Sequence, residues 1–254
     1  MRIGIAGIGG RMGRLLAEEA QVADELVGGT ERPGSSEVGP PGIALVDIAT
    51  LARMAEVVID FTHASAVIAH ANALAEAGTP WVLGTTGLGA SEQAAVDEAA
   101  HRIPVVQASN FSAGVTLLLS LAEQVAAVLP ADAYDAEILE MHHRQKVDAP
   151  SGTALSLGQA VARGRKTEFE SVMELARAGH TGPRKTGVIG FAALRGGQVV
   201  GEHTLLFAGA HEHIALTHRA FDRRVFAQGA LRAARWVIGQ PPGRYGMQDV
   251  LGLR

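Results

Sequence analysis

Residues 2–13 read Arg-Ile-Gly-Ile-Ala-Gly-Ile-Gly-Gly-Arg-Met-Gly and decide how the first part of the chain folds. The run Arg2–Ala6 is typical of a buried strand, and Met12–Val22 has the one-face spacing of a helix. Glycines stand between them at positions 7, 10 and 13, whereas the strict G-x-G-x-x-G spacing would need glycine in place of Met12. A strand, a glycine-rich turn and a helix in this order predict a site where a dinucleotide pyrophosphate lies against free backbone N–H groups.

An acidic residue stands where such a site needs one. Glu31 follows the second predicted strand, at the position where a carboxylate binds the ribose hydroxyls. Arg32 comes directly after it, and a guanidinium there suits a 2′-phosphate. The pair therefore predicts NADH or NADPH as the cofactor. The alternative is a tight strand-to-helix turn that is rich in glycine for packing reasons alone.

Strands and Ala-rich helices alternate through the first 110 residues, which predicts βαβ units and a parallel sheet covered on both faces. Two polar segments, 84–87 and 108–111, follow predicted strands, at the sheet edge where open α/β sheets bind ligands. We expect strands at Arg2–Ala6, Glu25–Gly28, Val57–Phe61, Trp81–Gly84 and Ile103–Gln107, and helices at Met12–Val22, Ser65–Ala77 and Ser91–Ala100, the last capped by Ser91.

The pattern changes after Asn110. A long apolar helix is followed by strands in close succession, which predicts a meandering antiparallel or mixed sheet in a second, α+β domain. The expected elements are helices at Ser112–Leu129 and from about Ser151, strands at Glu137–Met141, Val188–Leu194, Val200–Phe207 and His213–His218, and a helix at Arg223–Ile238 before a Pro/Gly-rich tail.

Composition excludes several classes of protein. The 254 residues are 47% hydrophobic and 19% charged, as in a globular chain, and the net charge of −4 speaks against a nucleic-acid partner. No apolar run approaches the roughly 20 residues that span a bilayer. Cysteine is absent, so there is neither a disulfide framework nor a thiolate metal site. The first residues lack the pattern of a secretory signal, and we expect a cytoplasmic protein without a metal.

The segment Glu140–Ala154, EMHHRQKVDAPSGTA, concentrates reactive side chains between a predicted strand and a helix. His142 and His143 change protonation near neutral pH, and Lys146 supplies a charge and a proton. Residues 151–153 fall in the first turn of the helix, where hydroxyls and N–H groups suit a substrate carboxylate. The alternative is a capped helix with surface histidines and an unrelated lysine.

This segment resembles the signature of the dihydrodipicolinate reductases, H-H-x-x-K-x-D-A-P-S-G-T. The resemblance covers almost the whole chain and includes residues 7–13, 60–62, 84–87 and 110–112, and in the second half 179–182, 189–191, 195–197, 201–204, 217–220 and 226–230. It implies reduction of a cyclic imine dicarboxylate, 4-hydroxy-tetrahydrodipicolinate, to tetrahydrodipicolinate and water, in lysine and diaminopimelate biosynthesis. The cofactor would carry the hydride, so the chemistry needs no metal.

The resemblance also implies roles for individual residues. His142 matches the catalytic histidine and Lys146 the proton donor. The substrate-binding positions are matched by His143, Lys146, Ser151, Gly152 and Thr153. The cofactor contacts are matched by Gly7, Ile8, Gly9, Gly10, Arg11, Met12, Glu31, Arg32, Gly84, Thr85, Thr86, Ala108, Ser109, Asn110 and Phe111.

The fold that the resemblance implies is α/β, with a Rossmann-like dinucleotide-binding domain and an α+β domain whose mixed sheet makes a homotetramer. The first would comprise residues 1–110 and the returning segment 222–254, and the second residues 111–221, joined by hinges near Asn110 and Phe221. The chain departs from the pattern at Gly164–Ser171, which is short and charged, and at His211 and His213. These departures concern the oligomer and not the proposed chemistry.

Two other functions fit the same scaffold. One is a different reductase, such as an aspartate dehydrogenase or a general imine reductase, which only the 142–153 segment separates from the named family. The other is a sensor that binds NAD(P) without chemistry. Retention of both His142 and Lys146 favours an enzyme over a sensor.

Overall fold

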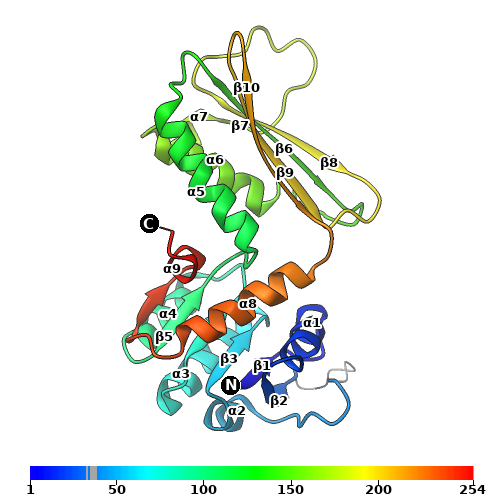
Figure 1. Cartoon of the computed structure of the whole chain (residues 1–254), viewed down its shortest axis with the longest axis vertical. Helices are drawn as coiled ribbons and strands as arrows, with labels where there is room; N and C mark the ends of the chain where they lie inside the picture. Colours follow the sequence, from blue (N-terminus) through cyan, green and yellow to red (C-terminus); the bar gives the residue numbers. More distant parts are fainter. Residues whose placement is uncertain (33, 35–38, 254) are drawn as a thin grey trace. The chain divides into compact units, whose positions relative to one another are not determined.

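The structure is a computed structural model that describes residues 1–32, 34 and 39–253 (Figure 1). The chain divides into two compact units. Unit 1 contains Met1–Ala113 and Arg224–Arg254, and unit 2 contains Gly114–Arg223. Among the described residues, no helix combines the length and apolar character needed to cross a membrane.

Unit 1 is built on a parallel sheet. Its strands are ordered β11-β5-β4-β3-β1-β2, and every neighbouring pair is parallel. The strands are β1 (Arg2–Ala6), β2 (Glu25–Thr30), β3 (Val57–Asp60), β4 (Trp81–Leu83), β5 (Pro104–Gln107) and β11 (Gly243–Tyr245). The helical elements are α1 (Arg11–Ala20), α2 (Ile48–Met54), the 3₁₀ turn η1 (Ala64–Ala66), α3 (Val67–Ala77), α4 (Ala90–Ala100), α8 (Arg224–Val237) and α9 (Met247–Leu251).

Helices cover both faces of this sheet. Successive strand residues point to opposite faces, so Ile59 packs with α1 and α8, while Val58 packs with α2, α3 and α4. Two apolar layers of this kind require strands that are apolar on both faces, and Val57–Ile59 of β3 and all of β4 are apolar and buried. The predicted parallel sheet and its two covered faces are confirmed.

Several features of unit 1 differ from the sequence prediction. Helices α2 and α9 were not predicted. The Pro/Gly-rich tail contains β11, which pairs in parallel with β5 and whose Tyr245 ring lies 5.1 Å from that of Trp236. This strand consists of Gly243, Arg244 and Tyr245, and without an apolar run it has no sequence pattern of a buried strand. Ser91 is not the cap of α4, because the helix already begins at Ala90 and the N–H of Gly89 donates to Oε2 of Glu92 (3.0 Å).

Unit 2 contains a mixed sheet with helices packed on it. The strand order is β10-β9-β6-β8-β7. The strands are β6 (Asp135–His142), β7 (Met173–Glu174), β8 (Ile189–Arg195), β9 (Gly201–Ala208) and β10 (His213–Ala220), and the helices are α5 (Ala113–Val128, whose first residue belongs to unit 1), α6 (Gly152–Gly164) and α7 (Phe169–Val172).

The mixed sheet is confirmed, but it is not a simple meander. β8 and β9 follow each other in the chain, yet β6 lies between them, parallel to β8 and antiparallel to β9. Within this sheet, β9 and β10 are consecutive in the chain and form a hairpin. Along β6, Ala136 and Ile138 are buried in a core shared with α5 and α6. Glu140 and His142 continue the same alternation and therefore project from the helix-covered face.

We expect Gly229→Ala to lower the free energy of unfolding by about 2–3 kcal/mol. A Cβ at this position of α8 would lie 1.7 Å from the backbone oxygen of Phe111, which cannot rotate away. Denaturant titration followed by circular dichroism measures the effect. Gly246→Ala is the matched control, because its Cβ would meet only Asp249, at 4.0 Å. Equal stability of the two variants would show that this close approach is not needed.

Candidate active site

The glycine-rich loop of unit 1 joins β1 to α1 and is tied to β2. The N–H groups of Gly7 and Ile8 both donate to the carbonyl oxygen of Thr30, at 3.0 and 3.1 Å. Gly7 has φ +74°, a left-handed conformation that favours glycine. At Gly13 a Cβ would lie 2.1 Å from the oxygen of Gly7, so only glycine lets the helix approach the strand this closely. The loop is thus positioned by backbone contacts on both sides.

The acidic residue predicted for the ribose lies beside this loop. The Glu31 carboxylate accepts a short hydrogen bond from the N–H of Gly9. Met12 is half-buried against the core, and Arg11 is exposed. A cavity of about 410 Å³ opens here within unit 1. One group of lining residues surrounds the glycine-rich loop and the end of β2: Gly7, Gly10, Thr30, Glu31 and Arg32. A second group comes from the segment after β3 and from α3: Phe61, Thr62, His63, Ser65, Ala66 and His70.

The buried carboxylate of Asp60 holds part of the second group of lining residues, and the sequence prediction gave Asp60 no role. Asp60 is 0% exposed and accepts hydrogen bonds from the N–H and the hydroxyl of Thr62, at 3.0 and 2.6 Å. Its other oxygen lies 2.7 Å from Nδ1 of His70. Residues 60–62 are among the segments that resemble the family, but no function was predicted for them. Its partner His70 lies ten residues further on, which no local pattern indicates.

The two other predicted cofactor segments lie at the ends of β4 and β5 but do not line this cavity, as far as the described residues define it. Thr85 is buried, and its hydroxyl donates to the carbonyl of Thr62 (3.3 Å). Phe111 is also buried, with its ring 5.4 Å from that of Phe61. Gly84, Thr86, Ala108, Ser109 and Asn110 occupy the same two strand ends.

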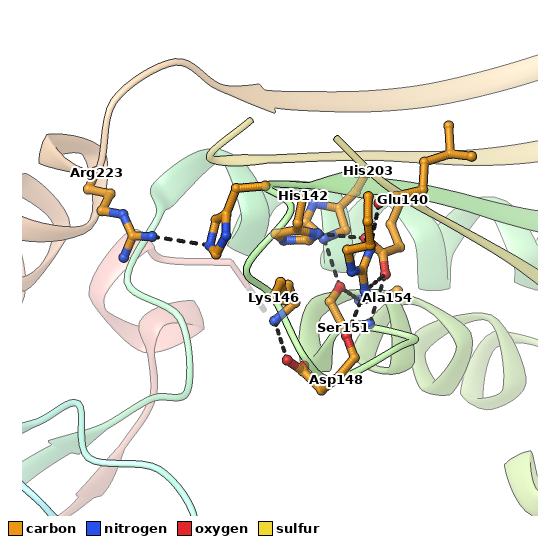
Figure 2. A network of polar contacts seen from close by, with 11 residues as sticks. Glu140, His142, Lys146, Asp148, Ser151, Ala154, His203 and Arg223 are labelled. Carbon is orange, nitrogen blue, oxygen red and sulfur yellow. Dashed lines mark hydrogen bonds and ion pairs between the residues drawn. The ribbon is translucent and has the colours of Figure 1, made fainter. Parts of the chain in front are cut away.

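In unit 2, His142 ends β6 and forms a close pair with Glu140 (Figure 2). Nδ1 of His142 lies 2.5 Å from Oε2 of Glu140. Arg195 at the end of β8 donates to both oxygens of the same carboxylate, each at 2.8 Å. Glu140 is 1% exposed and His142 8% exposed, so the charges of this group are shielded from water. The histidine is thereby held in one orientation.

Protonation in this group follows from its surroundings. Burial raises the pKa of Glu140, but hydrogen bonds from Arg195 and His142 outweigh it and leave that pKa below its ordinary value. Burial lowers the pKa of His142, and the hydrogen bond to Glu140 only partly opposes the shift. Near neutral pH Glu140 is therefore ionised and His142 neutral. Because a carboxylate only accepts hydrogen bonds, the imidazole proton stands on Nδ1 and leaves Nε2 as the basic nitrogen.

Ser151 connects this group to helix α6. Its hydroxyl accepts from the N–H of Ala154 (3.3 Å), and its own N–H donates to Oε1 of Glu140 (3.1 Å). The hydroxyl also lies 3.1 Å from Nε2 of His203, whose pKa burial lowers to about 4. Ser151 is 2% exposed, so its hydrogen bonds to the helix start and to Glu140 are buried. Gly152 is exposed at the start of the helix, and Thr153 is half-buried.

Cationic side chains stand around the connection from β6 to α6. Nζ of Lys146 lies 2.8 Å from Oδ1 of Asp148, and this hydrogen bond lowers the pKa of Asp148. Nη2 of Arg223, the last residue of unit 2, lies 3.4 Å from Nε2 of His143 (Figure 2). With Arg195, these groups provide positive charge suited to an anionic ligand.

Known proteins match the chain from end to end. Residues 1–111 match the family described as dihydrodipicolinate reductase, N-terminus, and residues 114–251 match dihydrodipicolinate reductase, C-terminus. The chain belongs to the dihydrodipicolinate reductase family. The family resemblance drawn from the sequence is thus confirmed.

Individual relatives agree with the family assignment. A 4-hydroxy-tetrahydrodipicolinate reductase of Granulibacter bethesdensis is 63% identical over 100% of this chain and 98% of its own length. One of Thiobacillus denitrificans is 51% identical over 100% and 99%. Among solved structures, a dipicolinate-bound dihydrodipicolinate reductase from Paenisporosarcina sp. TG-14 has a TM-score of 0.81 at 24% identity and covers 98% of both chains. At that identity, the likeness concerns the fold.

In this member of the dihydrodipicolinate reductase family, the structure links His142 and Ser151 through Glu140, while Lys146 pairs with Asp148. The sequence prediction assigned no role to Glu140, Arg195 and His203, which hold His142 and Ser151, or to Arg223, which lies beside His143. One signal was available: Glu140 and His142 are two apart on a strand and therefore share a face. Arg195 and His203 come from β8 and β9, and only strand pairing brings them to β6.

Proposed function

We propose that this protein reduces 4-hydroxy-tetrahydrodipicolinate to tetrahydrodipicolinate and water, with NADH or NADPH as reductant. The observation that carries the proposal is the pair of His142 and Glu140, which Ser151 links to the start of α6, with Lys146 in the loop between them. In addition, the chain is 63% identical over its whole length to a protein named 4-hydroxy-tetrahydrodipicolinate reductase. The reaction loses one water from the substrate and adds one hydride and one proton.

The residues of unit 1 fit a dinucleotide. Gly7, Gly10 and Gly13 keep side chains away from the backbone at the N-terminus of α1, where a pyrophosphate finds N–H groups and the positive end of the helix dipole. Glu31 in the adjoining cavity suits ribose hydroxyls, and exposed Arg32 suits a 2′-phosphate. When bound, the nicotinamide would supply the hydride.

The residues of unit 2 fit a dicarboxylate. The first turn of α6, with Gly152 and Thr153, offers the positive end of a helix dipole to one carboxylate. Lys146, His143 and Arg223 offer cationic or hydrogen-bonding groups to the other. Holding both carboxylates restricts the orientation of the ring, which is a large part of catalysis of this kind.

Two side chains would move protons. Lys146 would stabilise the electron-rich enamine that hydride addition at C4 creates and would give it the one proton that the reaction consumes. His142, with Nε2 as its basic nitrogen, would be the second acid–base group. Asp148 holds the ammonium of Lys146 at 2.8 Å and limits its freedom.

We also propose that the sheet of unit 2 makes a homotetramer. Leu139 and Leu194 are 45% and 48% exposed on the face opposite α5 and α6. Register places Ala192 and Thr204 beside Leu139, which extends a weakly polar surface across three strands. An exposed apolar sheet face of this kind marks an interaction site.

The activity test is oxidation of NADH or NADPH with substrate generated in place from pyruvate and aspartate semialdehyde by the preceding synthase. We expect Lys146→Ala and His142→Ala to lower kcat by about 10²–10⁴-fold with cofactor affinity unchanged. Lys185→Ala, an exposed lysine of the same unit, is the control. Equal loss of turnover and cofactor binding would contradict these roles. Intact cofactor binding without any oxidation would favour another imine reductase or a sensor.

The cofactor assignment is tested by fluorescence titration with NADH and NADPH. We expect Glu31→Ala to weaken both by about tenfold, since a charge-assisted hydrogen bond is lost, and Arg32→Ala to weaken NADPH alone. Glu98→Ala on the surface of α4 serves as the control. Unchanged affinities in Glu31→Ala would show that Glu31 does not bind the ribose.

Light scattering tests the oligomer. The wild-type chain should have the mass of four copies, and Leu139→Glu should dissociate it because four charges would be buried in the assembly. Val128→Glu on α5 is the control, as Val128 is 77% exposed outside the sheet. A monomeric wild-type protein would overturn the proposal.

A further inference from the structure

We propose that Glu140, held by Arg195, is a positioning residue that keeps the proton of neutral His142 on Nδ1 and ties this histidine to the first turn of α6. The inference rests on the proposed function in giving His142 an acid–base role. It concerns residues to which the sequence assigned no role, and its main test does not require turnover.

The contacts of the Glu140 carboxylate are complete and directional. Oε2 accepts from His142 and from Nη1 of Arg195, while Oε1 accepts from Nη2 of Arg195 and from the N–H of Ser151. All four donors lie between 2.5 and 3.1 Å from the oxygens. A buried carboxylate with four donors is stable only as the anion. It therefore gives His142 a permanent acceptor at Nδ1 and directs acid–base work to Nε2.

Arg195 contacts both the carboxylate of Glu140 and the backbone of Asp148. Its two-pronged contact neutralises Glu140 and so prevents the carboxylate from taking the proton of His142. Nη2 of the same guanidinium also donates to the carbonyl oxygen of Asp148 (2.6 Å), next to the carboxylate that holds Lys146. One arginine thus orients both proposed acid–base groups.

The link to α6 passes through Ser151. This residue caps the helix with its hydroxyl and donates its N–H to Glu140, so the helix start cannot shift without disturbing the carboxylate. On the other side of His142, a Cβ at Gly201 would lie 3.0 Å from Nε2. Glycine at this position leaves room beside the nitrogen that would exchange the proton.

Charged or titratable groups face His142 from each element packed against it. Glu140 on β6 favours the imidazolium, whereas Arg195 on β8 and Lys146 in the following loop disfavour it. His203 on β9 lies edge-on, with its ring 5.1 Å away, and His218 on β10 lies next to His203 in the register. Removing the anion or removing the cation should therefore move the titration of His142 in opposite directions.

The experiment is a ¹⁵N and ¹³C NMR titration of the histidine rings in the full chain, with His142→Gln to assign the resonances. In the wild type, neutral His142 should carry its proton on Nδ1. In Glu140→Gln the titration midpoint should fall and the Nδ1 tautomer should no longer dominate, because an amide can also donate to Nδ1. In Arg195→Gln the midpoint should rise. Midpoints that move in the same direction, or do not move, would overturn the proposal.

Activity supplies the second measurement. Glu140→Gln should lower kcat by about 10- to 100-fold and shift its pH profile downward with the NMR midpoint, with cofactor affinity unchanged. Glu140→Asp should recover part of the rate and the Nδ1 tautomer. If Glu140→Gln does not fold, Glu140→Asp replaces it, and its midpoint and rate should lie between those of the wild type and of a chain without the carboxylate. If the wild type showed no turnover, the proposed function would fail while the NMR titration still decided the role of Glu140.

Glu123→Gln is the matched control. Glu123 on α5 pairs with Arg163 on α6 at 2.9 Å, and both side chains are exposed. This variant removes a Glu–Arg pair of the same unit without touching the group around His142. It should leave the His142 titration and kcat as in the wild type, and a shift equal to that of Glu140→Gln would overturn the specific role of Glu140.

Discussion

The carboxylate of Glu140 has almost no access to water, and the organisation of the unit 2 site depends on that constraint. An ionised group in such surroundings needs donors for both of its oxygens, and the chain supplies them from β6, β8 and the start of α6. Meeting this need brings a histidine, an arginine and a helix terminus together. The order of the strands is what makes it possible, since β6 lies between β8 and β9.

Unit 1 is organised by a different constraint, the close approach of backbone to backbone. The turn after β1 packs against the start of α1 at a distance that excludes a side chain on Gly13. The N–H groups of the same turn donate to the carbonyl of Thr30 in β2, the strand that leads to Glu31. The loop proposed to bind the pyrophosphate and the carboxylate proposed to bind the ribose are thus held by one packing arrangement. The Asp60–His70 pair fixes another part of the cavity lining by a buried hydrogen bond.

Much of this architecture was predictable. Alternating strands and helices gave the parallel sheet of unit 1, and the closely spaced strands gave the mixed sheet of unit 2. β7 and β11 were not predictable, because Met173–Glu174 and Gly243–Tyr245 contain no apolar run, whereas the equally short β4 is apolar throughout. The start of α4 was misplaced because Ser91 is a good capping residue, whereas the structure uses the side chain of Glu92.

The sequence by itself determined the chemistry that is available: the glycines at 7, 10 and 13, the acidic residue at 31, and the segment from His142 to Thr153. These signals are local, because each depends on residues that are neighbours in the chain or one turn apart. Tertiary structure alone decided which nitrogen of His142 carries the proton and what holds Ser151. Those answers depend on Arg195 and His203, which lie 55 and 52 residues beyond their partners Glu140 and Ser151. Strand register, and not any local pattern, brings such residues into contact.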